Sequence, residues 1–269
     1  MPPASRNRSQ PDDVDQLEVP AAVVCAVCGE AECGGCANEL SRSGIVTLVV
    51  WERPGGRALS KLWETARATT RNAETFFELL PDGPVAPALR FAFACELLAA
   101  TGSIASLLVL VGAIAPGWLR HVALDSAARD LALRLVVLGI PSLALLLVLA
   151  HAAHGLSLDR GARKSGAPSS RSRALRFGLY ATGWDLVIGP IGAVVVAWKE
   201  GLGAALALGS LTVGLPTRSA RAFLRGCYRL NGKAADRAVG TSYVTAFVAT
   251  MVGAVAIVVA AIAAILAIG

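Results

Sequence analysis

A wholly apolar stretch runs from Leu135 to Ala150 and reads LVVLGIPSLALLLVLA. It has no charged side chain, and Ser142 is its only polar one. A helix on the surface of a soluble protein would show a polar stripe at the helical period, and this segment shows none. With Ala152 and Ala153 it approaches the roughly 20 residues that cross a bilayer as a helix. The pattern therefore predicts a transmembrane span.

Further apolar stretches follow the same pattern and bring the expected number of spans to about five. The predicted spans cover residues 91–115, 133–153, 176–198, 201–217 and 241–268. Only Lys199 and Glu200 separate the third from the fourth, and the fourth is short before Pro216. We therefore expect an all-α polytopic membrane domain over residues 88–269.

Basic residues gather in two of the loops between these stretches. They are Arg160, Arg163, Lys164, Arg171, Arg173 and Arg176 before the third span, and Arg218, Arg221, Arg225, Arg229, Lys233 and Arg237 before the last. Positively charged loops stay on the cytoplasmic side, so an even number of crossings must separate the two loops. This places the N-terminus in the cytoplasm and the C-terminus on the opposite side. The Ala- and Arg-rich composition suggests a bacterium and hence its inner membrane.

The overall composition agrees with a membrane protein that carries a soluble extension. Hydrophobic residues make up 55% of the chain and charged residues only 16%, whereas soluble domains average about 25% charged. The net charge of +6 comes from residues that lie largely in loops, which argues against nucleic acid and leaves the lipid bilayer as the expected partner. Residues 1–24 are polar and lack the apolar core of a signal peptide, so we expect a disordered cytoplasmic tail.

Four of the six cysteines form a C-x2-C-x4-C-x2-C array. Its members are Cys25, Cys28, Cys33 and Cys36. Two such turns supply the tetrahedral four-thiolate set that structural Zn²⁺ prefers. Disulfides are the alternative, but a leader without a signal peptide favours a reducing compartment. Together with a candidate strand at Ile45–Val50, the array predicts a small zinc-ribbon-like module over residues 25–56.

The array also looks like the core of FYVE-type fingers, in which adjacent cysteine pairs serve different zinc ions. The further pairs of those fingers are missing from this sequence. Either one zinc ion is held within the hairpin, or two chains share their metals. The sequence leaves both arrangements open, and with them the oligomeric state, homo-oligomers included.

Over residues 57–81 apolar residues recur at the spacing of an α-helix. The residues on its less polar arc are Leu59, Leu62, Trp63, Ala66, Thr70, Ala73, Phe76, Phe77 and Leu80. This amphipathic helix either packs on the zinc module or lies in the membrane interface. Since it runs directly into the first span, we favour an interfacial helix with Trp63, Phe76 and Phe77 at the headgroup boundary.

Two acidic residues fall inside predicted spans, Glu96 in the first and Asp185 in the third. Such residues cost about 2.5–3.5 kcal/mol at a helix centre and usually face a partner or a cavity. They suggest a proton- or cation-linked polar site, although Glu96 has the alternative of reaching the headgroups beside Arg90. His151 and His154 lie one helical turn apart, but a histidine pair without neighbouring carboxylates is a poor metal site.

Several motifs resemble those of the Yip family of five-span membrane proteins. The matching residues are Trp51-Glu52-Arg53, Phe76-Phe77, Arg176-Phe177, Tyr180, the run from Ile188 to Gly192, Gly226-Cys227-Tyr228-Arg229, Gly232 and Arg237-Ala238. The resemblance implies a cytosolic N-terminus and, in the bacterial branch, an N-terminal cysteine motif. Eukaryotic members interact with Rab GTPases, a role that does not transfer intact to a bacterium.

No Ser-His-Asp arrangement, phosphate loop, dinucleotide fingerprint or HExxH is present, so we expect no enzyme. The first hypothesis is a membrane scaffold or adaptor whose zinc module recruits an unidentified cytosolic protein. The alternative is a small transporter or channel that uses Asp185. Redox sensing by the cysteines is a third and weaker hypothesis, because the four-cysteine spacing suits metal better.

Overall fold

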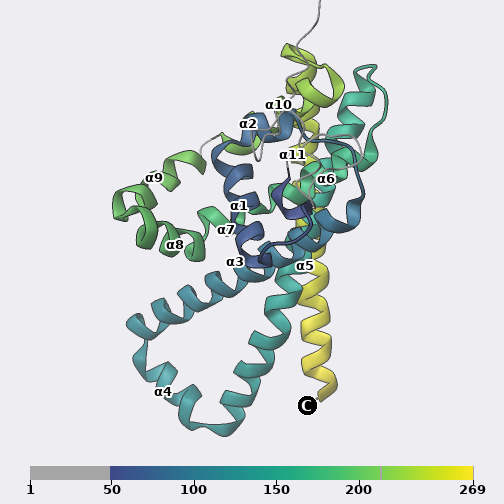
Figure 1. The fold of residues 1–269 in the computed structure, drawn as a ribbon. Helices are drawn as coiled ribbons and strands as arrows, with labels where there is room; N and C mark the ends of the chain where they lie inside the picture. The colour runs from purple at the N-terminus through teal and green to yellow at the C-terminus, as the bar shows by residue number, and fades with distance from the viewer. Residues whose placement is uncertain (1–48, 213, 269) are drawn as a thin grey trace, which may run out of the picture. The chain divides into compact units, whose positions relative to one another are not determined.

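A computed structural model describes residues 49–212 and 214–268, and these residues form helices without any strand (Figure 1). The polar tail, the four-cysteine array and most of the candidate strand lie outside the described residues. Val50, at the end of that candidate strand, begins the short 3-10 helix η2 (Val50–Glu52).

Three helices are long and apolar enough to cross a membrane: α3 (Val85–Ile114), α5 (Ser126–Lys164) and α11 (Gly232–Ile268). They correspond to the first, second and last predicted spans. The short helix α4 (Pro116–Leu124) joins α3 to α5. Most of the large apolar side chains from α4 through the first half of α5 are exposed, as is expected of surfaces that face lipid.

The region between α5 and α11 differs from the sequence prediction. Helices α6 (Arg171–Ala181) and α7 (Gly183–Ile188) lead to α8 (Pro190–Glu200), with a bend of 61° at Gly189. The bend follows from Pro190, which disfavours helical backbone in the preceding residue, and Gly189 has an extended ψ of 177°. This bent pair forms at most one broken span.

The predicted fourth span is wrong in length. Helix α9 (Leu202–Thr212) has 11 residues, about 16 Å by helical rise, which is half of the ~30 Å hydrocarbon core. Glycines with positive φ precede and follow it, Gly201 at 93° and Gly214 at 76°. The described chain therefore has three span-length helices, or four with the bent pair, where five spans were expected. Apolar composition indicated the segment but not where its helix ends.

The predicted helix over residues 57–81 divides at Asn72 into α1 (Ala58–Arg71) and α2 (Ala73–Glu78). Phe76 and Phe77 are 3% and 0% exposed, and the Phe77 ring packs against Phe177. Their predicted place at the headgroup boundary is therefore corrected to the protein core. The periodicity revealed an apolar face, but α6, α7 and α10 (Leu215–Tyr228) cover it instead of lipid. Trp63 is half-buried at the edge of the same core.

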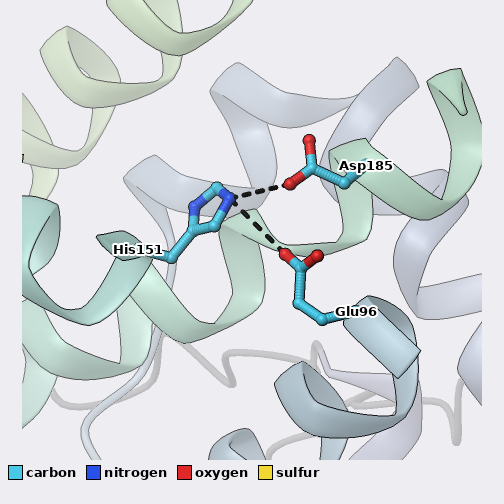
Figure 2. A group of neighbouring side chains, drawn as sticks. All are labelled: Glu96, His151 and Asp185. Atoms are coloured by element: carbon cyan, nitrogen blue, oxygen red, sulfur yellow. Dashed lines mark hydrogen bonds and ion pairs between the residues drawn. The ribbon is translucent and has the colours of Figure 1, made fainter. Parts of the chain in front are cut away.

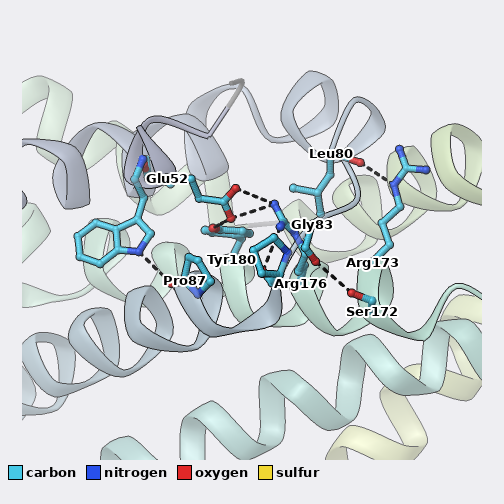
Figure 3. A network of polar contacts seen from close by, with 11 residues as sticks. Glu52, Leu80, Gly83, Pro87, Ser172, Arg173, Arg176 and Tyr180 are labelled. Atoms are coloured by element: carbon cyan, nitrogen blue, oxygen red, sulfur yellow. Dashed lines mark hydrogen bonds and ion pairs between the residues drawn. The ribbon is translucent and has the colours of Figure 1, made fainter. Parts of the chain in front are cut away.

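A buried polar network holds the segment before α1 against α6 (Figure 3). The Glu52 carboxylate lies 2.9 Å from the fully buried Arg176 guanidinium and accepts a 2.5 Å hydrogen bond from the Tyr180 hydroxyl. The Trp51 indole donates to the carbonyl of Pro87 at 2.8 Å. Trp51 and Glu52 thus hold the segment that precedes α1 against α3 and α6.

Candidate functional site

Three ionisable side chains from three different helices meet inside the helical domain (Figure 2). Glu96 comes from α3, His151 from α5 and Asp185 from α7. The His151 Nε2 atom lies 3.0 Å from Asp185 Oδ2 and 3.6 Å from Glu96 Oε1. One potential ligand atom from each residue lies within 4.8 Å of the other two. We call these residues the acid–histidine cluster.

Small residues allow the helices to approach closely enough to form this cluster. A Cβ atom at Gly178 of α6 would overlap the backbone oxygen of His151, and one at Gly155 of α5 would overlap the carbonyl of Ala174. Glycines at such positions allow the backbones of neighbouring helices to come into contact in lipid. On α3, alanines at positions 92, 99 and 100 are buried on either side of Glu96. Close packing of α5 on α6 therefore helps to position the backbone of His151.

The Glu96 carboxylate is the least satisfied group of the cluster. Its side chain is 0% exposed, and neither carboxylate oxygen has a hydrogen-bond partner in the described part of the chain. Buried polar groups are almost always hydrogen-bonded, because leaving them unpaired costs free energy. The carboxylate therefore needs a proton or a bound cation to complete its surroundings.

A cavity of about 450 Å³ opens beside the cluster, between residues of α3, α5, α7 and α10. Among its described lining residues Asp185 alone is ionisable, and that side chain is 42% exposed. Trp184 forms part of the wall and is fixed by a 2.8 Å hydrogen bond from its indole to the carbonyl of Thr69. Asp185 thus faces an open space, while Glu96 lies buried behind it.

In the structure Glu96 and Asp185, the two acids identified in the sequence, lie close together. His151 lies beside both, and the sequence had not predicted it as their partner. Asp185 had no basic neighbour at its depth by sequence, yet His151 lies in direct hydrogen-bonding contact with it. The alternative that Glu96 reaches toward headgroups with Arg90 is wrong, since Glu96 is fully buried and Arg90 is exposed. In the sequence, the one indication that His151 could be such a partner was its position within a predicted apolar span.

His154 does not join the cluster, although it follows His151 by one turn. Its ring packs against Phe177 and Tyr243 at centroid distances of 5.9 Å and 5.4 Å. It is 6% exposed, and its Nε2 atom has no hydrogen-bond partner among the described residues. The pair His151 and His154 is therefore not a joint metal site, and His151 pairs with carboxylates instead.

The remaining predicted ligands, Cys25, Cys28, Cys33 and Cys36, lie outside the described residues. Of the other two cysteines, Cys95 is buried and Cys227 is half-buried, and neither forms a disulfide with another described residue. Burial raises the pKa of the Cys227 thiol, which lowers its fraction of reactive thiolate. Both cysteines contribute to packing.

In comparisons with known proteins, no protein-family model, no curated protein and no solved structure matches this chain. The likeness to the Yip family therefore stays a prediction from its motifs. The residues that the structure describes are helical throughout, with three or four candidate membrane spans.

Proposed function

We propose that this chain is an integral membrane protein that transports a cation, with Glu96, His151 and Asp185 as its binding site. The observation that carries the proposal is the buried carboxylate of Glu96, which has no hydrogen-bond partner among the described residues and faces a histidine and a second carboxylate beside a cavity. Ionisable residues within membrane segments are costly and usually mark ion pathways. Two carboxylates with one imidazole form a site that attracts positive charge.

The depth of the cluster fits an entry site near one face of the membrane. Glu96 lies 18 residues before the end of α3 at Ile114, which is about 27 Å by helical rise. This is close to the ~30 Å thickness of the hydrocarbon core. The cluster therefore lies at the end of the α3–α5 hairpin that is opposite to α4, on the side of the basic loops.

We propose further that the segment from α6 to α9 enters the membrane and returns on the same side. Glu200, at the end of α8, forms ion pairs with Arg67 and Arg71 of α1 at 3.0 Å and 2.5 Å. Such a charged group suits the interface and not the hydrocarbon core. A segment that returns satisfies the even number of crossings between the two basic loops. Three full spans then put the cytoplasmic N-terminus and the C-terminus on opposite sides of a bacterial inner membrane.

Flux through proteoliposomes tests the proposal. The purified full chain is reconstituted with entrapped fluorescent reporters for protons, K⁺ and Mn²⁺, and each ion is offered outside. We expect flux of one of these cations, and we expect Glu96→Gln and Asp185→Asn to abolish it. Glu64→Gln is the matched control, because Glu64 is an exposed acid of α1 outside the cluster. Absence of flux, or undiminished flux in both cluster variants, would contradict the proposal.

A second function, a membrane adaptor with a structural zinc module, has its own support. The four-cysteine array is suited to zinc, and Trp51 and Glu52 dock the segment that follows it onto the helical domain. Affinity purification in mild detergent, with zinc assayed, would compare the native chain with Cys25→Ser/Cys28→Ser. The adaptor loses zinc and a cytosolic partner together in this variant and tolerates Asp185→Asn. The transporter shows the opposite pattern of sensitivity.

A further inference from the structure

We infer that the acid–histidine cluster binds a divalent ion of the first transition row, with Glu96, His151 and Asp185 as its three protein ligands. The inference rests on the proposed function in that it names the class of cation carried. It assigns a metal site within the helical domain, separate from the cysteine array.

The spacing of the ligand atoms is close to that of a metal site. In a tetrahedral site with bonds of about 2.0–2.2 Å, the ligand atoms lie roughly 3.3–3.6 Å from one another. His151 Nε2 is 3.0 Å from the Asp185 oxygen and 3.6 Å from the Glu96 oxygen. All three ligand atoms lie within 4.8 Å of one another, so an ion would bind as the two carboxylates adjust around it.

The chemistry of the ligands selects the class of ion. Ca²⁺ and Mg²⁺ prefer all-oxygen surroundings, and Cu⁺ prefers thiolates and thioethers, so an imidazole with two carboxylates suits neither group. It suits Mn²⁺, Fe²⁺, Co²⁺ and Zn²⁺. One divalent charge also balances two carboxylates, which lets the buried Glu96 stay ionised.

Two features indicate that the cluster is a binding site and not a closed internal contact. Within residues 49–212 and 214–268 the Glu96 oxygens have no hydrogen bond although they are fully buried, and a metal ion at the cluster would satisfy them. Three protein ligands leave a coordination position open, as in sites where a fourth ligand exchanges. Asp185 connects this position to the adjoining cavity of about 450 Å³, which gives the ion a path in or out.

Mn²⁺ binding to the full chain in detergent tests the inference. Mn²⁺ is the probe because oxygen and nitrogen ligands hold it, whereas the four-thiolate array prefers softer metals. The electron paramagnetic resonance signal of free Mn²⁺ reports binding, and a rise in melting temperature with Mn²⁺ gives a second measurement. We expect one ion per chain, with affinity reduced at least about tenfold in each of Glu96→Gln, His151→Gln and Asp185→Asn.

Two controls separate this site from the rest of the chain. His121→Gln changes an exposed histidine of α4 outside the cluster and should leave the affinity unchanged. A variant with serine at Cys25, Cys28, Cys33 and Cys36 should also keep it. Binding that His151→Gln leaves intact, or that disappears with the cysteines, overturns the inference.

The flux assay distinguishes failure of the inference from failure of the proposed function. Mn²⁺ binding at the cluster without flux of any cation supports the metal site and refutes transport. Flux of protons or K⁺ that depends on Asp185, with no Mn²⁺ binding, refutes the metal site and leaves transport standing. Binding and Mn²⁺ flux that both depend on the cluster support the two together.

Discussion

Replacing Gly178 with alanine should separate α5 from α6 and loosen the acid–histidine cluster. A Cβ atom there would overlap the backbone oxygen of His151 and lie 2.9 Å from its carbonyl carbon, whereas nonbonded carbon atoms keep about 3.5–4.0 Å apart. The obstructing atoms belong to the backbone of a long helix, so no side-chain rotation relieves the overlap. The two helices must therefore move apart at the residue that supplies the histidine.

The magnitude follows from two opposing terms. Overpacking of this kind costs about 1–3 kcal/mol, and the backbone contact argues for the upper end. Replacing glycine with alanine within a helix by itself stabilises the folded state by about 0.5–1 kcal/mol. We therefore expect a net loss of about 2 kcal/mol in the free energy of unfolding, or roughly a thirtyfold change in the folding constant.

The assay is denaturant unfolding in detergent, with Mn²⁺ affinity measured on the folded fraction. Gly240→Ala is the matched control, because a Cβ at this exposed position of α11 meets nothing within 4 Å. The control should be neutral or slightly stabilising and should bind Mn²⁺ normally. Equal stability and equal affinity in the two variants would refute the role given to the close approach of α5 and α6.

Other predictions concern residues outside the cluster. Arg176→Met should destabilise the chain by about 3–5 kcal/mol, because it leaves the Glu52 carboxylate without its buried partner; wild-type stability in denaturant unfolding would contradict this. The hydrogen bond from Arg225 lowers the pKa of Glu78, so this pair stabilises the fold above the ordinary glutamate pKa and stops doing so as pH falls through the lowered value. The stability difference between wild type and Glu78→Gln should therefore shrink on acidification, and a difference independent of pH would oppose the pairing. Iodoacetamide should modify Cys227 more slowly in the folded than in the unfolded chain, as followed by peptide mass spectrometry, since burial raises the pKa of its thiol; equal rates would contradict that assignment.

The wrong position for Phe76 and Phe77 and the meeting of Glu96 and Asp185 in one cluster have a common explanation. A helical period reports that one face is apolar, and it carries no information on whether protein or lipid covers that face. An acid in an apolar span reports that a partner is needed, because the cost of an unpaired charge there is large whatever the fold. The first pattern therefore left the environment of the apolar face open, whereas the second predicted that each acid has a polar partner without identifying that partner as His151.

The sequence by itself determined three segments that are long and apolar enough to span a membrane, those of α3, α5 and α11, because transfer into lipid is a local property summed over about 20 residues. It also determined that α3 and α7 each carry an acid. Only the tertiary structure decided that the segment from α6 to α9 is broken into short helices and that His151 meets Asp185, 34 residues away. The physical reason is that helix contacts depend on which faces fit together. Here Gly155 and Gly178 set that fit, and hydropathy does not record it.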